Sequence, residues 1–92
     1  MSHGAIVTGT DGSESATAAL KQAAELAASS AVALHVVSGY PPGDAAPPEA
    51  VRRVLETARE ALGDIDVDVR LHAEPGTPAG AICAVAARVG AG

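Results

Sequence analysis

The sequence has very few aromatic residues: it contains no phenylalanine, no tryptophan and one tyrosine. Because 48% of its 92 residues are nonetheless apolar, the core has to be built mainly from Ala, Val, Leu and Ile. Such small side chains favour helices and sheets that pack closely. A chain of this length also buries a smaller share of its surface than one of about 150 residues. We therefore expect residues 1–92 to form a single small domain that needs every element for its stability.

Cysteine is also nearly absent. The only cysteine, Cys83, excludes an internal disulfide and any metal site built on a pair of cysteines. A single thiol is typical of a reduced, cytoplasmic protein. Because Cys83 flanks the apolar positions of a predicted helix, we expect a small buried residue rather than a nucleophile.

Positive charge is scarce and scattered along the chain. The chain contains six Lys and Arg residues and eleven acidic residues, which gives a formal net charge of −5. Binding to nucleic acid or to an anionic membrane surface requires clustered Lys and Arg, so we expect neither. The sequence also shows no basic-then-apolar leader and no apolar run near the roughly 18 residues of a membrane helix. These observations favour a cytoplasmic protein.

Residues 5–15 organise the rest of the chain. This segment, Ala-Ile-Val-Thr-Gly-Thr-Asp-Gly-Ser-Glu-Ser, begins as an apolar run and changes directly into a cluster of turn-forming residues. A short apolar run of this kind is typical of a strand buried on both faces of a parallel sheet. Asp11 is then expected at the carboxyl end of a central strand. Open α/β sheets bind their ligands at that edge, beside the start of the next helix.

Strand and helix patterns alternate along the whole chain. After the opening strand, they predict a helix over 14–29, a strand over 31–37, a loop over 38–48, a helix that ends at Gly63, a strand over 64–74 and a helix that ends at Gly90. This alternation predicts a three-layer α/β fold, β-α-β-α-β-α, with an open parallel sheet. The third strand alternates between apolar and polar residues, which indicates an edge strand. We therefore expect the strand order 3-2-1.

The predicted helix ends carry residues that cap or stop helices. These are Ser13 or Ser15 for the first helix, Pro48 in the first turn and Gly63 at the end of the second, and Thr77, Pro78 and Gly90 for the third. We expect Gly63 to take the left-handed conformation that commonly ends a helix.

Two interpretations of residues 9–13 remain open. The cluster Gly-Thr-Asp-Gly-Ser can be a tight turn whose side chains satisfy loose backbone amides. It matches neither the dinucleotide-binding glycine pattern nor the phosphate-binding P-loop pattern. However, the carboxylate of Asp11 can accept hydrogen bonds from an adenine amino group or a ribose hydroxyl.

The remaining candidate residues favour structural roles. His35 has no second ligand at a suitable spacing, so we expect a structural histidine in an interior strand. His72 is expected to be solvated on the exposed face of the third strand. Ser13 has no histidine partner that would support a hydrolase triad.

The combined segments resemble the universal stress protein family. The resemblance rests on Ile-Val-Thr-Gly-Thr-Asp-Gly-Ser-Glu-Ser near the start, Ala-Leu-His-Val-Val in the second strand and Gly-Thr-Pro-Ala-Gly-Ala-Ile before the third helix. It covers most of residues 4–90. It implies the adenine-nucleotide α-hydrolase-like fold of that family, with a five-stranded parallel sheet in the order 3-2-1-4-5.

The resemblance also implies a ligand and its site. Many members of the family bind ATP or another adenine nucleotide. The positions that match Gly9, Thr10 and Asp11 contact the adenine and ribose, and the position that matches Val36 helps to enclose the base. The phosphates are held by a glycine-rich pattern after the fourth strand, which is not found in this sequence. We therefore expect either a truncated form or a shortened relative, an incomplete domain that lacks the last two strands and binds nucleotide weakly by itself.

The leading hypothesis is a stress-response or signalling module that binds ATP or a related adenine nucleotide, with at most slow ATP hydrolysis. The alternative is an interaction domain that binds no nucleotide and forms a homodimer through an exposed sheet edge. An ATP pyrophosphatase is disfavoured because its Ser-Gly-Gly-x-Asp-Ser pattern is absent after the first strand. No metal ligand set is expected.

Overall fold

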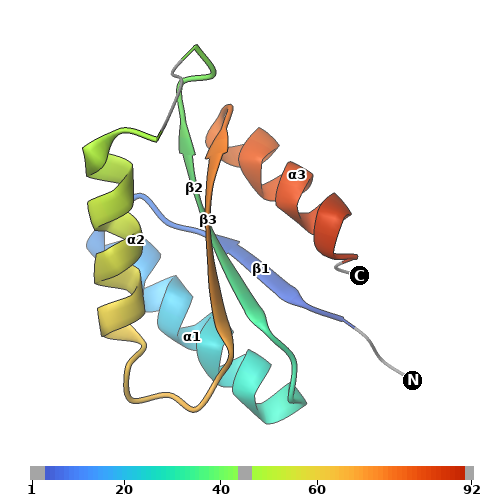
Figure 1. The fold of residues 1–92 in the computed structure, drawn as a ribbon. Coiled ribbons are helices and arrows are strands. Elements are labelled where there is room, and N and C mark those ends of the chain that lie inside the picture. The colour runs from blue at the N-terminus through green and yellow to red at the C-terminus, as the bar shows by residue number, and fades with distance from the viewer. Residues whose placement is uncertain (1–3, 44–46, 91–92) are drawn as a thin grey trace.

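The computed structural model describes residues 4–43 and 47–90 (Figure 1). Its strands and helices alternate along the chain as β1 (Ile6–Gly9), α1 (Glu14–Ser30), β2 (Leu34–Tyr40), α2 (Glu49–Ala61), β3 (Val69–Pro75) and α3 (Pro78–Val89). Among these residues, no helix is both long and apolar enough to cross a membrane.

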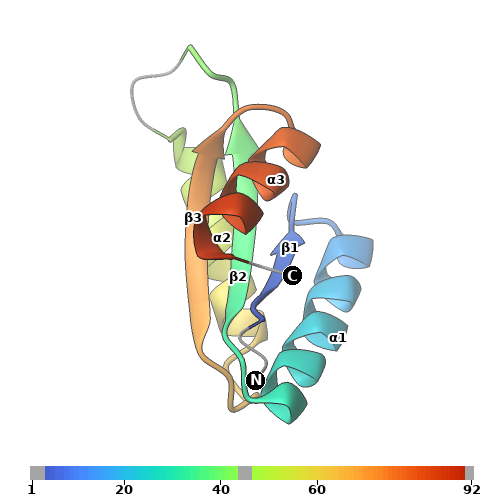
Figure 2. The ribbon, with the colours of Figure 1, turned by 90° about the vertical axis from the view of Figure 1, so that its right-hand side faces the viewer.

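The three strands form one parallel sheet in the order β1-β2-β3. Thr8 lies beside Val36, and Val36 lies beside Leu71. Helices α1 and α2 cover one face of the sheet, and α3 covers the other (Figure 2). The predicted α/β class, parallel sheet and strand order are therefore confirmed.

Strand β1 differs from its prediction because it is an edge strand of the described sheet. It pairs only with β2, and all four of its residues are half-buried rather than buried. By contrast, β2 lies between two strands, and its first five residues are buried. The continuous apolar run predicts burial on both faces, but burial also depends on a neighbour along the sheet, which a local pattern does not specify.

Strand β2 begins and ends three residues later than predicted. Helix α1 extends to Ser30 and ends at Ala31, which takes the left-handed conformation (φ 57°) and donates its amide hydrogen to the carbonyl groups of Ala27 and Ala28. Residues 31–33 therefore form a turn instead of the start of a strand. At the other end, pairing with β3 continues to Tyr40, so Ser38 lies in the strand and not in the predicted loop. Part of that loop, residues 44–46, lies outside the described residues.

Strand β3 is also shorter than the alternating pattern. Pairing starts where Leu34 meets Val69, so the prediction of a strand over 64–74 is wrong for residues 64–68. These residues form turns and bends. Ile65 and Val67 nevertheless pack against the core on the α1 and α2 side. The alternation therefore reports burial correctly even where no ladder forms.

The helix ends follow the predictions in part. Ser13 caps α1, and Thr77 caps α3 by accepting a hydrogen bond from the amide of Gly80 at 3.1 Å. Pro78 begins α3, and Gly90 ends it with φ 69°. Pro48, expected in the first turn of α2, is instead its N-cap.

The prediction for Gly63 is wrong, because the left-handed glycines of the described chain are Gly12, Gly76 and Gly90. Helix α2 ends instead at Leu62, whose amide donates to the carbonyl of Ala58, and Gly63 donates to Glu60. Leu62 is 2% exposed. The buried leucine and these tight turns close the helix without a left-handed residue.

The core consists of two clusters on opposite faces of the sheet. The larger cluster joins α1 and α2 to β2 through Leu20, Ala24, Ala27, Leu34, Val36, Leu55, Ala58 and Leu62. The smaller cluster joins α3 to the other face through Val37, Ala81 and Val85. Cys83 on α3 is exposed, so the expectation that it is buried is wrong. It lies on the side of α3 opposite the residues that contact the sheet.

Candidate functional site

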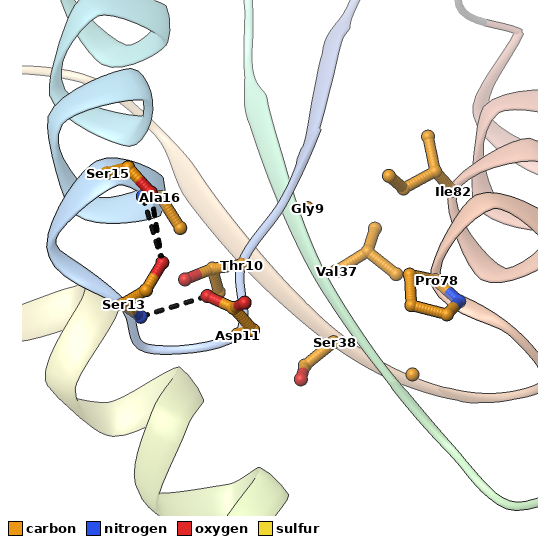
Figure 3. A pocket seen from close by; sticks show the side chains of 11 residues that line it. Gly9, Thr10, Asp11, Ser13, Ser15, Ala16, Val37, Ser38, Pro78 and Ile82 are labelled. Atoms are coloured by element: carbon orange, nitrogen blue, oxygen red, sulfur yellow. Dashed lines mark hydrogen bonds between the residues drawn. The ribbon is translucent and has the colours of Figure 1, made fainter.

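The carboxyl ends of β1 and β2 form the floor of a cleft of about 440 Å³. The amino-terminal ends of α1 and α3 stand on its two sides (Figure 3). Its lining consists of Gly9, Thr10, Asp11, Ser13, Ser15, Ala16, Val37, Ser38, Gly39, Pro78 and Ile82. The cleft therefore lies at the edge of the sheet where the sequence predicts a ligand site.

Asp11 lies in the turn that connects β1 to α1. One of its carboxylate oxygens accepts a hydrogen bond from the amide of Ser13 at 2.9 Å. The hydroxyl and the amide of Ser13 lower the pKa of the Asp11 carboxyl group. Asp11 is therefore ionised at neutral pH. Its second oxygen points away from Ser13, toward the open middle of the cleft, where it can accept a hydrogen bond from a ligand (Figure 3).

Side chains of the same turn also accept hydrogen bonds from its backbone amides. The hydroxyl of Thr10 accepts a hydrogen bond from the amide of Gly12 at 3.2 Å, and Gly12 takes a positive φ of 83°. The hydroxyl of Ser13 accepts one from the amide of Ala16 at 3.2 Å. Residues 9–13 thus form a tight turn, as the first of the two interpretations holds. Four of them also line the cleft, as the second requires: Gly9, Thr10, Asp11 and Ser13.

Gly39 brings the start of α3 close to the cleft. A Cβ atom at this position would lie 2.9 Å from the carbonyl oxygen of Gly76, which is too close for a real contact. Only a glycine therefore lets the turn between β3 and α3 cross the end of β2. The amide of Gly76 donates to the carbonyl of Tyr40 at 2.8 Å and fixes this crossing. Pro78 then follows directly at the rim of the cleft.

Gly9, Thr10 and Asp11, which the sequence singles out, lie together at the cleft, but Val36 does not. Val36 is completely buried in the larger cluster, on the face covered by α1 and α2. Its neighbour Val37 lines the cleft instead. Adjacent residues of a strand point to opposite faces, so the side chain of Val37 faces the cleft and that of Val36 faces the core. Placing Val37 from sequence requires knowing which face α3 covers.

The two strand histidines, expected to be unconnected, form a pair in the structure. Nδ1 of His35 and Nε2 of His72 lie 2.8 Å apart, so the side chains share a hydrogen bond between β2 and β3. His35 is 6% exposed, and His72 is half-buried instead of solvated. Burial lowers the pKa of both. The charge of Arg70 lowers the pKa of His35 further, and the charges of His35 and Arg88 lower that of His72. Within the described parts of the chain, no three His, Cys, Asp or Glu residues converge as a metal site would need.

The fold and the cleft define an α/β protein with a ligand-sized cleft at the carboxyl edge of a parallel sheet. The model of the universal stress protein family matches residues 3–91, and the chain belongs to this family. No curated protein sequence matches the chain.

Solved structures of the family share the fold. A universal stress protein in complex with cAMP is 22% identical and superposes with a TM-score of 0.85, over 99% of this chain and 73% of the other. One from Archaeoglobus fulgidus is 26% identical, with a TM-score of 0.81 over 96% and 70% of the two chains. One from Burkholderia pseudomallei is 25% identical, with a TM-score of 0.75 over 97% and 76%. The chain thus spans about three quarters of the length of these structures.

Proposed function

We propose that this protein binds an adenine nucleotide, with ATP as the leading ligand, in the cleft between α1 and α3 and acts as a stress-response or signalling module in the cytoplasm. The single observation that carries the proposal is the ionised carboxylate of Asp11, which has one oxygen toward a cleft of about 440 Å³. Membership of the universal stress protein family supports it, as does the cAMP bound to a protein of the same fold.

The two walls of the cleft suit the two parts of a nucleoside. The carboxylate of Asp11 can accept hydrogen bonds from ribose hydroxyls, and such charge-assisted bonds are stronger than neutral ones. On the other wall, Val37, Pro78 and Ile82 offer apolar surface to the base. Gly9 and Thr10 form the floor between them. Val37 therefore takes the role that the sequence gives to Val36.

The phosphates contribute little to affinity in this proposal. None of the described residues that line the cleft is Lys or Arg. The start of α1, with Ser13 and Ser15, is the part of the lining that best tolerates negative charge, because a helix begins with free amides and a partial positive charge. We therefore expect ATP, cAMP and adenosine to bind with similar affinities.

Isothermal titration of the chain with these three ligands tests the proposal. Asp11→Asn keeps the size of the side chain and removes its charge, so we expect all three affinities to fall about tenfold to a hundredfold. The matched control is Asp68→Asn, which alters an exposed carboxylate paired with Arg70 outside the cleft and should leave them unchanged. Absence of binding, or equal affinities for the Asp11 variant and the unmodified chain, contradicts the proposal.

A homodimer is the second candidate, and the edge position of β1 favours it. The amide of Ile6 donates to the carbonyl of Ala33, just before β2, and the amide of Thr10 donates to Val37 in β2. The amide of Val7 therefore points away from β2. An edge strand with free backbone groups can pair with a second copy of the chain.

Val7→Pro tests this candidate because proline removes the outward donor while leaving the donors that face β2 in place. If the dimer forms through this edge, sedimentation velocity should show a dimer for the unmodified chain and a monomer for Val7→Pro. Thr8→Val, in the same strand, leaves the outward amide of Val7 in place. It is the control and should remain dimeric. A monomeric unmodified chain, or a dimer that survives Val7→Pro, excludes the edge.

A further inference from the structure

The apolar wall of the cleft ends at a close contact between two elements. Ile82, on the first turns of α3, lies against Gly9 at the end of β1 (Figure 3). A Cβ atom at Gly9 would lie 2.7 Å from Cδ1 and 3.3 Å from Cγ1 of Ile82. Ile82 is half-buried and packs against the smaller core cluster of Val37, Ala81 and Val85. The side chain of Ile82 is thus held in place by two contacts, one with the backbone of Gly9 and one with the smaller core cluster.

This contact determines the shape of the cleft at its apolar end. The polar side chains of Thr10, Asp11 and Ser13 stand on the α1 side, and Ile82 stands on the α3 side (Figure 3). A nucleoside whose ribose contacts Asp11 has room to place its base on the α3 side of the cleft, where Ile82 lies. A purine extends further from its sugar than a pyrimidine does, because the sugar is attached to the smaller of two fused rings.

We propose that Ile82, seated on Gly9, is a specificity-determining residue that contacts the far ring of a purine base and selects purines over pyrimidines. This inference rests on the proposed function, since it concerns the same cleft. Pyrimidines gain nothing from Ile82 because they are too short to reach it. The selectivity comes from apolar contact area and requires no hydrogen bond to the base.

Ile82→Ala is the first test. It removes three carbon atoms from the end of the cleft, so the affinity for ATP and adenosine should fall about tenfold, in the range that small changes in apolar pockets produce. The affinity for CTP and cytidine should stay the same. The ratio of purine to pyrimidine affinity, measured by isothermal titration, therefore collapses. Val89→Ala, in the same helix and against the same core cluster but outside the cleft, is the control and should leave the ratio unchanged.

A paired substitution tests the seating of Ile82 on Gly9. Gly9→Ala places a methyl group against Cδ1 of Ile82, the flexible end of the side chain, so that this end has to leave its present position at the cleft. Purine affinity should fall about tenfold, at the lower end of the range for small changes in an apolar pocket. Ile82→Val lacks Cδ1, so the double variant Gly9→Ala/Ile82→Val should bind purines about as well as Ile82→Val alone. Circular dichroism of each variant checks that the fold is kept.

The outcomes separate this inference from the proposed function. If the unmodified chain binds no nucleotide, both are overturned. If it binds purines selectively but Ile82→Ala leaves the purine to pyrimidine ratio unchanged, the role of Ile82 is overturned and nucleotide binding stands. If Ile82→Val does not restore purine affinity in the Gly9→Ala background, the seating on Gly9 is overturned. A ratio that collapses in Ile82→Ala, together with restoration in the double variant, supports the inference.

Discussion

The face of the sheet under α1 and α2 is packed with leucine, valine and alanine, whereas the face under α3 combines a small apolar cluster with a histidine pair and a wall of the cleft. On the first face, Leu20, Leu34 and Val36 are completely buried. On the second, one helix covers the sheet, and polar groups such as His72 and Glu74 remain half-buried. We therefore expect the first face, with the larger buried cluster, to contribute more to stability than the second, which also lines the cleft.

The largest expected effect tests the first face. Leu34 is 0% exposed at the centre of the larger cluster. Leu34→Ala should lower the free energy of unfolding by about 3 kcal/mol, because it removes buried contacts and leaves a cavity. Urea denaturation measures this change. Leu26→Ala, at a leucine that is 58% exposed on α1, is the control and should cost far less. Similar losses in both variants would contradict the view of a dominant core on this face.

A smaller effect, the dependence of stability on pH, tests the second face. Burial lowers the pKa values of His35 and His72. The charge of Arg70 lowers that of His35 further, and the charges of His35 and Arg88 lower that of His72, while Asp68 and Glu74 act in the opposite direction. A lowered pKa means that the unfolded chain binds protons that the folded chain does not. Stability is therefore fully present above the ordinary histidine pKa of about 6.5 and is lost as the pH falls below it.

Urea denaturation of the unmodified chain at pH 7.5 and 5.5 measures this loss. The double variant His35→Gln/His72→Gln should show a smaller difference between the two pH values, because both titrating groups are gone. His35 and His72 share one hydrogen bond, so each single variant should reduce the difference only in part. If the double variant shows the same difference in the free energy of unfolding as the unmodified chain, the pH dependence of stability comes from other groups and the account of the histidine pair is wrong.

The order of elements and the direction of the strands could be predicted from sequence because local patterns carry them. The apolar run before Asp11, the helical spacing of the alanines and the cap at Thr77 all depend on residues near one another in the chain. The alternation in β3 also indicates an edge strand. Likewise, Gly9, Thr10 and Asp11 reach the cleft because Gly9 ends the first strand and the other two follow it directly.

The features that could not be predicted depend on pairing between distant segments. The hydrogen bond between His35 and His72 requires the register of β2 and β3, in which His72 lies beside Val37. The choice of Val37 over Val36 depends on which face α3 covers. The close approach of Ile82 to Gly9 joins two segments that are far apart in the sequence, and it requires a residue without a side chain at position 9. None of these relations is written in the spacing of a single segment.

The cleft between the starts of α1 and α3 is proposed to bind an adenine nucleotide. Titration of adenosine into the isotope-labelled chain, followed by amide and methyl NMR shifts, tests it most directly. We predict saturable shifts at Gly9, Asp11, Ser38 and the methyl groups of Val37 and Ile82, with little change at Leu20 or Leu34 in the opposite core. Absence of saturable shifts, or shifts centred on the α1 and α2 face, would contradict the claim.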